Sequence, residues 1–183
     1  VEIRCNERVT SLDELFSQGY DAVFVSAGTM KPQKLGISGE DLPGVWEGVR
    51  FLQEAHLSVE DKKTFSVNQR VAVIGGGNVA VDCARTARRL GATEVAINYR
   101  RSRQEMPAYD FEMRSAEMEG VKAHFLAAPV RIERGGEEGE LRLHLIRMRL
   151  GDRDSSGRRQ SEAVRGGEFS ILVNQVLVAS GQV

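Results

Sequence analysis

Three consecutive glycines followed by a helical pattern are the first residues whose spacing indicates chemistry. Gly75, Gly77 and Ala80 fit the G-x-G-x-x-(G/A) pattern of dinucleotide-binding turns. In that pattern Gly75 allows a sharp turn, Gly77 lets the backbone approach a pyrophosphate, and Ala80 lets the helix lie close to the strand. The free N–H groups and the dipole at the start of the helix would bind the anion. The predicted pyrophosphate cradle consists of Gly75, Gly76, Gly77, Asn78, Val79 and Ala80, and a glycine turn without a ligand is the alternative.

A cluster of arginines after the next predicted strand indicates which dinucleotide is bound. Residues 94–99 form this strand, and Arg100, Arg101 and Arg103 follow it. Sites for unphosphorylated NAD carry Asp or Glu at this strand end, where the carboxylate accepts hydrogen bonds from the ribose 2′-hydroxyl. Guanidinium groups suit a 2′-phosphate instead, because they are planar and always charged. Two contacts of roughly 1.5–3 kcal/mol each would favour NADP over NAD by roughly 10²–10⁴. The prediction is an NADP(H) site, and a solvated basic turn is the alternative.

The elements that must position these residues follow a strand–helix alternation that later changes period. Val71, Val73 and Ile74 suit a buried parallel strand, and apolar residues then recur at helical spacing until Gly91 ends the helix. A helix over 109–119 and a strand over 121–126 continue the pattern. Residues 129–134 and 141–150 alternate like an antiparallel hairpin, and strands over 169–173 and 176–179 follow. The predicted fold class is α/β, a Rossmann-like parallel sheet with an antiparallel β-meander insertion.

The first 57 residues predict shorter elements and a connector. We expect a strand over 1–5, a helix from a Ser11-x-x-Glu14 capping box to about residue 18, and a buried strand over 21–29. The stretch 34–44 is rich in turn formers, and residues 45–57 read as a helix. Residues 21–28 also resemble 175–181, since both stretches end in small residues and a glycine, as strands do where a ligand comes close. Two ordinary strands that end in turns explain this likeness equally well.

Composition excludes several other functions. The net charge of −1 does not indicate a nucleic-acid surface, and no apolar run approaches the length of a membrane span. Cys5 and Cys83 are far apart, so neither a redox-active disulfide nor a cysteine metal site is expected, and a reducing cytoplasm is the predicted location. His56, His124 and His144 share no metal-binding spacing. No nucleophile–base pair and no paired carboxylates stand out, so we expect no catalytic acid or base and a cofactor that carries the reaction.

Several longer segments together resemble one protein family. They are Gly75-Gly76-Gly77-Asn78-Val79-Ala80-Val81-Asp82, Tyr99-Arg100-Arg101-Ser102-Arg103-Gln104-Glu105-Met106-Pro107-Ala108 and Leu35-Gly36-Ile37-Ser38-Gly39-Glu40-Asp41-Leu42-Pro43-Gly44-Val45. The chain is similar over nearly its whole length to the small (β) subunit of NADPH-dependent glutamate synthase. Relatives of that subunit include the reductase half of dihydropyrimidine dehydrogenase.

The resemblance implies a flavoprotein in which NADPH passes a hydride to FAD and electrons leave through iron–sulfur clusters. The partner would be a larger electron-accepting subunit, such as a glutamate synthase large subunit. Residues 1–45 would be the end of a split FAD-domain segment with a connector, and 46–183 the NADP-binding domain. The resemblance places Ala179, Ser180 and Gly181 near the nicotinamide. The FAD fingerprint and the cluster-binding cysteines would lie outside this chain, which starts at Val1 and reads as part of something larger.

Three alternatives stay open at this point. The first is an NADH-using oxidoreductase of the same fold, because an arginine or a serine can also contact an adenosine ribose. The second is a non-catalytic nucleotide-binding or regulatory module. The third, a methyltransferase that uses S-adenosylmethionine, fits poorly, since it would want an acidic residue where Arg100 stands.

Overall fold

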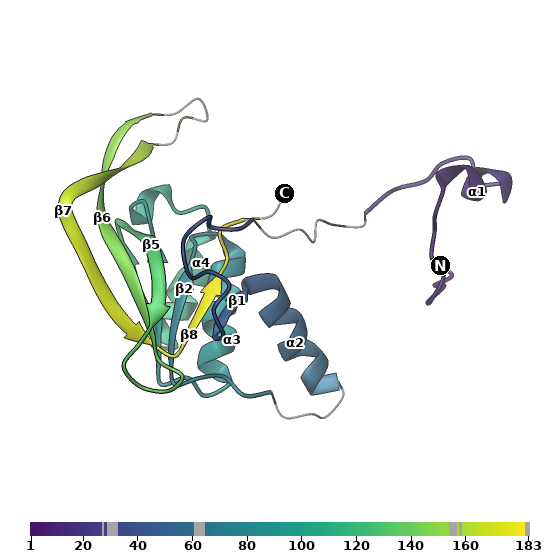
Figure 1. Cartoon of the computed structure of the whole chain (residues 1–183). Coiled ribbons are helices and arrows are strands. Elements are labelled where there is room, and N and C mark those ends of the chain that lie inside the picture. Colours follow the sequence, from purple (N-terminus) through teal and green to yellow (C-terminus); the bar gives the residue numbers. More distant parts are fainter. Residues whose placement is uncertain (27, 29–32, 61–64, 154–156, 158, 182–183) are drawn as a thin grey trace.

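The computed structural model describes residues 1–26, 28, 33–60, 65–153, 157 and 159–181. It contains two packed sheets, with three helices on the outer face of one sheet and a further helix apart from both (Figure 1). The helices are α1 (Leu12–Ser17), α2 (Gly48–Glu60), α3 (Asn78–Arg89) and α4 (Asp110–Met118), with a 3-10 turn, η1 (Arg103–Glu105). The strands are β1 (Val45–Glu47), β2 (Arg70–Ile74), β3 (Glu94–Tyr99), β4 (Lys122–Phe125), β5 (Ala127–Arg134), β6 (Leu141–Arg153), β7 (Arg159–Val173) and β8 (Gln175–Val178).

The first sheet is parallel and has the order β1-β8-β2-β3-β4. Because all five strands run the same way, their carboxyl ends meet at one edge, and the loops that follow β2, β3 and β8 lie there together. The second sheet is antiparallel, in the order β5-β6-β7, and it is inserted before the last strand of the first sheet. The predicted fold class is therefore confirmed.

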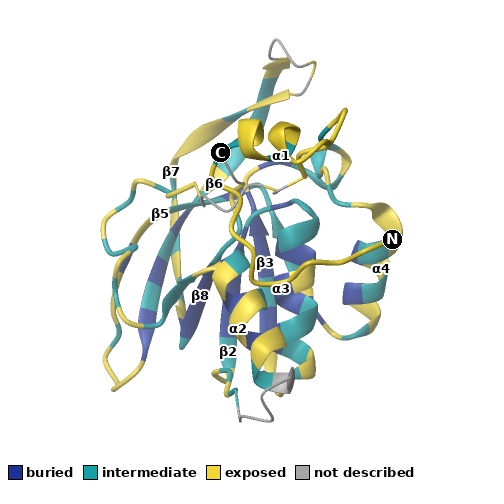
Figure 2. Ribbon diagram, turned by 90° about the vertical axis from the view of Figure 1, so that its right-hand side faces the viewer, coloured by how far each residue is buried: buried dark blue, intermediate teal, exposed yellow. Residues whose placement is uncertain are grey.

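The parallel sheet is buried on both faces, because β2 sends alternate side chains to two different cores (Figure 2). Val71 and Val73 pack with Phe51 of α2 and the inner residues of α3. Ala72 and Ile74 face the second sheet, the meander formed by β5, β6 and β7, and pack against its apolar residues, which include Leu143. The meander therefore covers the face of the parallel sheet that lies opposite the helices.

The connector between the N-terminal segment and β1 packs on the meander. Ser38 forms an isolated bridge with Arg131, and its carbonyl accepts a hydrogen bond of 2.8 Å from the Ile132 N–H. Gly39 has a φ of +84°, and a Cβ there would lie 1.9 Å from the Ile132 carbonyl oxygen. A glycine is therefore required at this contact for two separate reasons, conformation and space.

Several predictions for the N-terminal part are wrong. Residues 1–5 and the described part of 21–29 form no strand, and Phe24 is 91% exposed. Ala27 and Thr29 of that prediction lie outside the described residues. A strand needs a neighbour for its backbone groups, and Figure 1 shows this N-terminal segment apart from both sheets. The helix over 12–17 is confirmed, with Ser11 as its N-cap.

Other predicted boundaries also shift. The helix expected from Val45 begins at Gly48, because Val45 and Trp46 pair with β8 as a short strand. β7 begins at Arg159 rather than at residue 169, since it pairs with the full length of β6. The charged loop tip expected over 151–159 shrinks accordingly, and part of it lies outside the described residues.

We expect Gly39→Ala to destabilise the fold far more than Gly36→Ala. Gly36 also has a positive φ, +70°, but no atom lies within 4 Å of a Cβ there. Gly36→Ala, the matched control, should thus lower the free energy of unfolding only by the conformational penalty, about 1–2 kcal/mol. Gly39→Ala adds a backbone clash and should cost about 3 kcal/mol or more in urea unfolding. Equal losses in the two variants would contradict the packing of the connector on the meander.

Helices α3 and α4 are joined by a small cluster of charges. Arg85 and Arg89 each donate a hydrogen bond to Glu119 Oε1, at 2.9 and 2.6 Å between Nη2 and Oε1. Arg88 Nε donates to the Glu119 carbonyl at 3.0 Å. The hydrogen bonds from Arg85 and then Arg89 lower the pKa of the Glu119 carboxyl to about 2. Glu119 therefore stabilises the fold more when it is ionised than when it is protonated.

As pH falls, the domain should lose stability partly through protonation of this carboxylate. A pKa that is depressed in the fold contributes stability above the ordinary value near 4.5, and the contribution is lost as pH falls toward 2. Glu119→Gln should flatten the dependence of the melting temperature on pH between about 5 and 2. Glu138→Gln, in the exposed β5–β6 turn, is the control and should leave the profile unchanged. Parallel profiles for wild type and Glu119→Gln would show that the cluster adds no stability.

Candidate functional site

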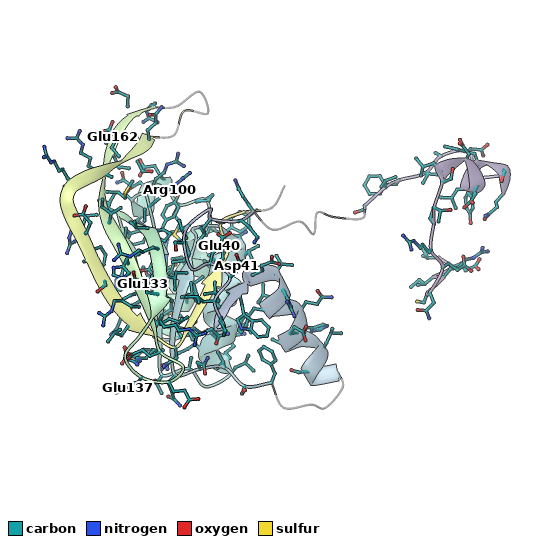
Figure 3. All side chains as sticks on the ribbon, in the orientation of Figure 1. Glu40, Asp41, Arg100, Glu133, Glu137 and Glu162 are labelled. Atoms are coloured by element: carbon teal, nitrogen blue, oxygen red, sulfur yellow. The ribbon has the colours of Figure 1, made fainter. Side chains whose placement is uncertain are left out.

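A cavity of about 570 Å³ lies at the carboxyl edge of the parallel sheet. It collects residues from the turn after β2, the end of β3 and the end of β8. Ten of the twelve predicted site residues line it: Gly75, Gly76, Gly77, Asn78, Val79, Arg100, Arg101, Ala179, Ser180 and Gly181. Ala80 and Arg103 do not. Figure 3 shows Arg100 at the end of the molecule toward which β8 points, and Glu137 at the opposite end.

Gly75 provides the close contact between neighbouring strand ends. Its φ is +145°, and a Cβ there would lie 2.2 Å from the Ala179 carbonyl oxygen. Its N–H donates to the Asn98 carbonyl at 3.1 Å. The pattern predicted a glycine that allows a sharp turn, and the structure adds that the turn is pressed between the ends of β3 and β8.

Gly76 is required by a neighbouring aromatic ring. A Cβ on it would lie 2.4 Å from the ring of Tyr99, and its carbonyl accepts a hydrogen bond of 3.1 Å from the Ala108 N–H. Tyr99 in turn donates its hydroxyl to the Glu105 carbonyl at 2.9 Å. The loop after β3 is thereby fastened over the glycine turn.

Gly77 is different, because nothing in the protein itself requires a glycine there. Its φ is −88°, which any residue can adopt, and no atom of the described residues lies within 4 Å of a Cβ at this position. Gly77 is the N-cap of α3, and no side chain caps this helix. The first N–H groups of a helix have no partner within it, so the turn offers both space and donors. This arrangement suits the backbone approach of a phosphate.

Asn78 has a structural contact in addition to its place in the cradle. Its Oδ1 accepts a hydrogen bond of 3.0 Å from the Tyr109 N–H, at the N-cap of α4. The side chain therefore joins the starts of α3 and α4. The sequence predicted only that Asn78 belongs to the pyrophosphate turn.

The three predicted arginines have different surroundings. Arg100 is exposed on the cavity, and Arg101 also lines it but is only 7% exposed. Arg103 binds α4 instead, with Nη2 at 2.8 Å from Asp110 and Nη1 at 3.0 Å from Glu117. Arg103, followed by Arg114, lowers the pKa of Asp110. The geometry thus supports a phosphate clamp of Arg100 and Arg101, and Arg103 has a role in holding α4.

Some cavity residues were not predicted from the sequence. Asn98 is 1% exposed, and its Nδ2 donates to two strand carbonyls while Oδ1 lies 3.1 Å from His124 Nδ1. A polar residue inside a buried strand was the available signal. Ala128 and Pro129 of β5 line the cavity because the meander packs there, and no local pattern shows such packing.

The end of β8 closes the other side of the cavity with small residues. Ser180 Oγ donates to the Gln33 carbonyl at 2.9 Å, and the Gln33 N–H donates to the Gly181 carbonyl at 3.1 Å. Lys34 also lines the cavity and lies 2.9 Å from Asp41. The likeness between 21–28 and 175–181 does not extend to structure, since only the second stretch contains a strand.

The described residues contain no helix that is long and apolar enough to cross a membrane. Within the same residues no group of His, Cys, Asp and Glu side chains is placed to hold a metal ion. Cys5 and Cys83 are both free thiols. Burial, and then the charge of Asp82, raises the pKa of Cys83 to about 12, and its Sγ lies 3.4 Å from the Gly48 carbonyl. Cys83 is therefore a packing residue between α2 and α3.

A parallel sheet with a glycine turn at its carboxyl edge and an uncapped helix after it defines a dinucleotide-binding domain. Residues 2–183 match the model of the pyridine nucleotide-disulphide oxidoreductase family. The chain belongs to this family.

The most informative relatives agree with this assignment. The chain is 44% identical to the β subunit of an NADP(+)-dependent formate dehydrogenase of Moorella thermoacetica, over 100% of this chain and 26% of the relative. It is 34% identical to the glutamate synthase [NADPH] small chain of Escherichia coli, over 99% of this chain and 40% of the relative. The resemblance to glutamate synthase small chains is thus confirmed, and the chain spans about a quarter to two-fifths of these proteins.

A solved structure shows the same fold. FprA from Mycobacterium tuberculosis in complex with NADPH superposes with a TM-score of 0.72 at 24% identity, over 94% of this chain and 52% of FprA. This likeness supports the fold of the parallel sheet and of the inserted meander together.

Gly77→Ala should separate ligand binding from folding. Because a methyl group there meets no protein atom, the free energy of unfolding should change by less than about 0.5 kcal/mol. The methyl group would occupy the space of an approaching pyrophosphate, so the affinity for nicotinamide dinucleotides should fall by about tenfold or more. Gly76→Ala is the contrasting variant and should lower the melting temperature through its clash with Tyr99. A Gly77→Ala protein that binds as wild type does would contradict the cradle.

Proposed function

We propose that this chain is the NADPH-binding domain of an FAD-dependent oxidoreductase that passes a hydride from NADPH to FAD. The observation that carries the proposal is the meeting of Gly77 and the Arg100–Arg101 pair on one cavity. A free helix start suits a pyrophosphate, and two guanidinium groups with no carboxylate at the end of β3 suit a 2′-phosphate.

Each part of the site has a separate task in this proposal. The turn from Gly75 to Ala80 holds the pyrophosphate through backbone N–H groups, with Ala80 acting behind the cavity by letting α3 approach β2. Arg100 and Arg101 hold the 2′-phosphate. Ala179, Ser180 and Gly181 leave room for the nicotinamide. The nicotinamide supplies the hydride and the flavin accepts it, so no acid or base from this chain is needed.

The residues present fit NADP(H) on structural grounds. The space beside Gly77 is open, because a Cβ there would meet no atom of the described residues within 4 Å. Arg100 lines the same cavity from the end of β3. Names of relatives agree, because an NADP(+)-dependent formate dehydrogenase subunit and a glutamate synthase [NADPH] small chain both match nearly the whole chain. The FAD assignment rests on the family resemblance.

The division into domains is also part of the proposal. Residues 1–45 would complete an FAD-binding domain, and residues 46–183 would form the NADP-binding domain. The N-terminal segment supports this division, because Ile3, Phe24 and Val25 are 83%, 91% and 64% exposed. Apolar side chains on a segment without a core of its own call for cover from another part of a larger protein.

The path of electrons beyond the flavin follows from the resemblance alone. We infer iron–sulfur clusters in the whole protein or in its partner, and a larger electron-accepting subunit such as a glutamate synthase large subunit. The composition of the chain, rather than the resemblance, is the basis for proposing a cytoplasmic enzyme that contacts neither nucleic acid nor membrane. The substrate that is finally reduced depends on that partner.

Calorimetric titration of the full chain with NADPH and NADH tests the proposal. Wild type should bind NADPH more tightly by about tenfold or more, and the Arg100→Ala/Arg101→Ala variant should lose the preference by weakening NADPH alone. Arg103→Ala is the matched control, because Arg103 binds α4 away from the cavity. It should keep the preference.

Two results would overturn parts of this proposal. Equal binding of both dinucleotides by wild type would indicate an NADH-using protein with surface arginines. Binding of neither would remove the support for a nucleotide site in this chain.

A further inference from the structure

A strained residue lies next to the arginine clamp, where the parallel sheet joins the meander. Among the described residues other than glycine, Asn6 and Leu126 have positive φ values. Asparagine tolerates this left-handed conformation, whereas leucine adopts it at a cost in free energy. Leu126, with a φ of +55°, stands between the last residue of β4 and the first of β5. Such strain persists only where the surroundings determine the backbone.

Two backbone hydrogen bonds hold Leu126 in this conformation. Its N–H donates to the carbonyl of Arg101 at 3.1 Å, and its own carbonyl accepts from the Met148 N–H at 2.8 Å. Arg101 follows β3 and lines the cavity, while Met148 belongs to the central strand of the meander. Leu126 therefore connects one of the two clamp arginines to the second sheet.

A bulge between β6 and β7 lies beside the Met148 end of this connection. The pairing passes from Ile146 to Met148 on β6 while β7 skips residues 164–167. Gly166 permits the bulge with a φ of +74°, and Gly167 permits it because a Cβ there would lie 2.9 Å from the Val164 carbonyl oxygen. The bulge interrupts the ladder next to Met148, and it bends the strand at this point.

The hydrogen bonds that run from Met148 through Leu126 end at Arg101, in the part of the cavity assigned to the 2′-phosphate. Arg100 and Arg101 line the cavity from the end of β3, and Ala128 and Pro129, two and three residues after Leu126, line it from the start of β5. Leu126 thus contacts both walls: its N–H holds the backbone of Arg101, and its φ directs the start of β5. A change in its conformation would move one wall relative to the other.

We propose that Leu126 is a positioning residue that sets the preference for a 2′-phosphorylated dinucleotide, by holding the Arg100–Arg101 corner on the meander. This inference rests on the proposed function. It assigns to the inserted meander a part in cofactor selection, in addition to its part in the core. The strain in Leu126 is the observation that separates this role from ordinary packing.

The test compares Leu126→Ile with Leu126→Gly in the full chain, titrated with NADPH and with NADH. Isoleucine keeps the apolar volume but is β-branched and disfavours a positive φ, whereas glycine adopts it freely and removes the side chain. Leu126→Ile should reduce the ratio of NADH to NADPH dissociation constants by about fivefold to thirtyfold. Leu126→Gly should keep the ratio within about threefold of wild type. If the Leu126 side chain acted only through packing, Leu126→Gly would lower this ratio more than Leu126→Ile.

A second variant covers the case in which Leu126→Ile does not fold. The methyl group added by Gly166→Ala would meet no atom of the described residues within 4 Å. Alanine is nevertheless disfavoured at the positive φ that residue 166 has in the bulge. It should lower the same ratio without changing the affinity for NADH. An unchanged ratio in folded Leu126→Ile, or in Gly166→Ala if the first variant is unfolded, overturns the inference.

The outcomes also separate this inference from the proposed function. If wild type discriminates, and Arg100→Ala/Arg101→Ala abolishes discrimination while Leu126→Ile retains it, only the inference fails. If wild type binds both dinucleotides equally or binds neither, the proposed function fails and the inference fails with it.

Discussion

The close approach of the ends of β2 and β8 is the constraint on which the rest of the site depends. The Ala179 N–H donates to the Ile74 carbonyl at 2.8 Å, and the Ala179 carbonyl lies where a Cβ of Gly75 would be. Only a glycine with its positive φ lets the chain leave β2 at this point and turn into α3. The same contact brings the small residues after β8 beside the uncapped start of α3.

The loop after β3 completes the site by lying over the glycine turn. Gly76 accepts a hydrogen bond from Ala108, and Asn78 accepts one from Tyr109. These bonds join the stretch after Tyr99 to the glycine turn, so the two segments that carry the family resemblance also contact each other. The arginines emerge from this loop at the edge of the cavity, with the meander on their other side.

The parts of the fold with strong local signals were predictable from the sequence. β2, α3 and β3 have clear periods and a glycine turn between them, so these elements and seven residues of the cavity lining followed from pattern alone, while Ala179, Ser180 and Gly181 followed from the family resemblance. Val45 was expected in a helix because its pairing with Val176 is a long-range contact that no local pattern shows. Arg103 was expected at the phosphate because spacing does not reveal that Asp110 and Glu117 bind its guanidinium.

The meander side of the site was the least predictable part. Ala128, Pro129 and Leu126 have no local signal for a role near a cavity, since their positions depend on contacts with the distant strand β6. The strain at Leu126 is likewise a property of the folded chain, because nothing in its neighbours in sequence favours a positive φ.

A crystal structure of the chain with NADP⁺ would show directly whether the cavity at the carboxyl edge of the sheet is the dinucleotide site. We expect the pyrophosphate on the backbone N–H groups at the start of α3, the 2′-phosphate between Arg100 and Arg101, and the nicotinamide beside Ala179. A 2′-phosphate in solvent, or on Arg103 with its bonds to α4 broken, would contradict the assigned clamp. A pyrophosphate bound away from Gly77 would contradict the site as a whole.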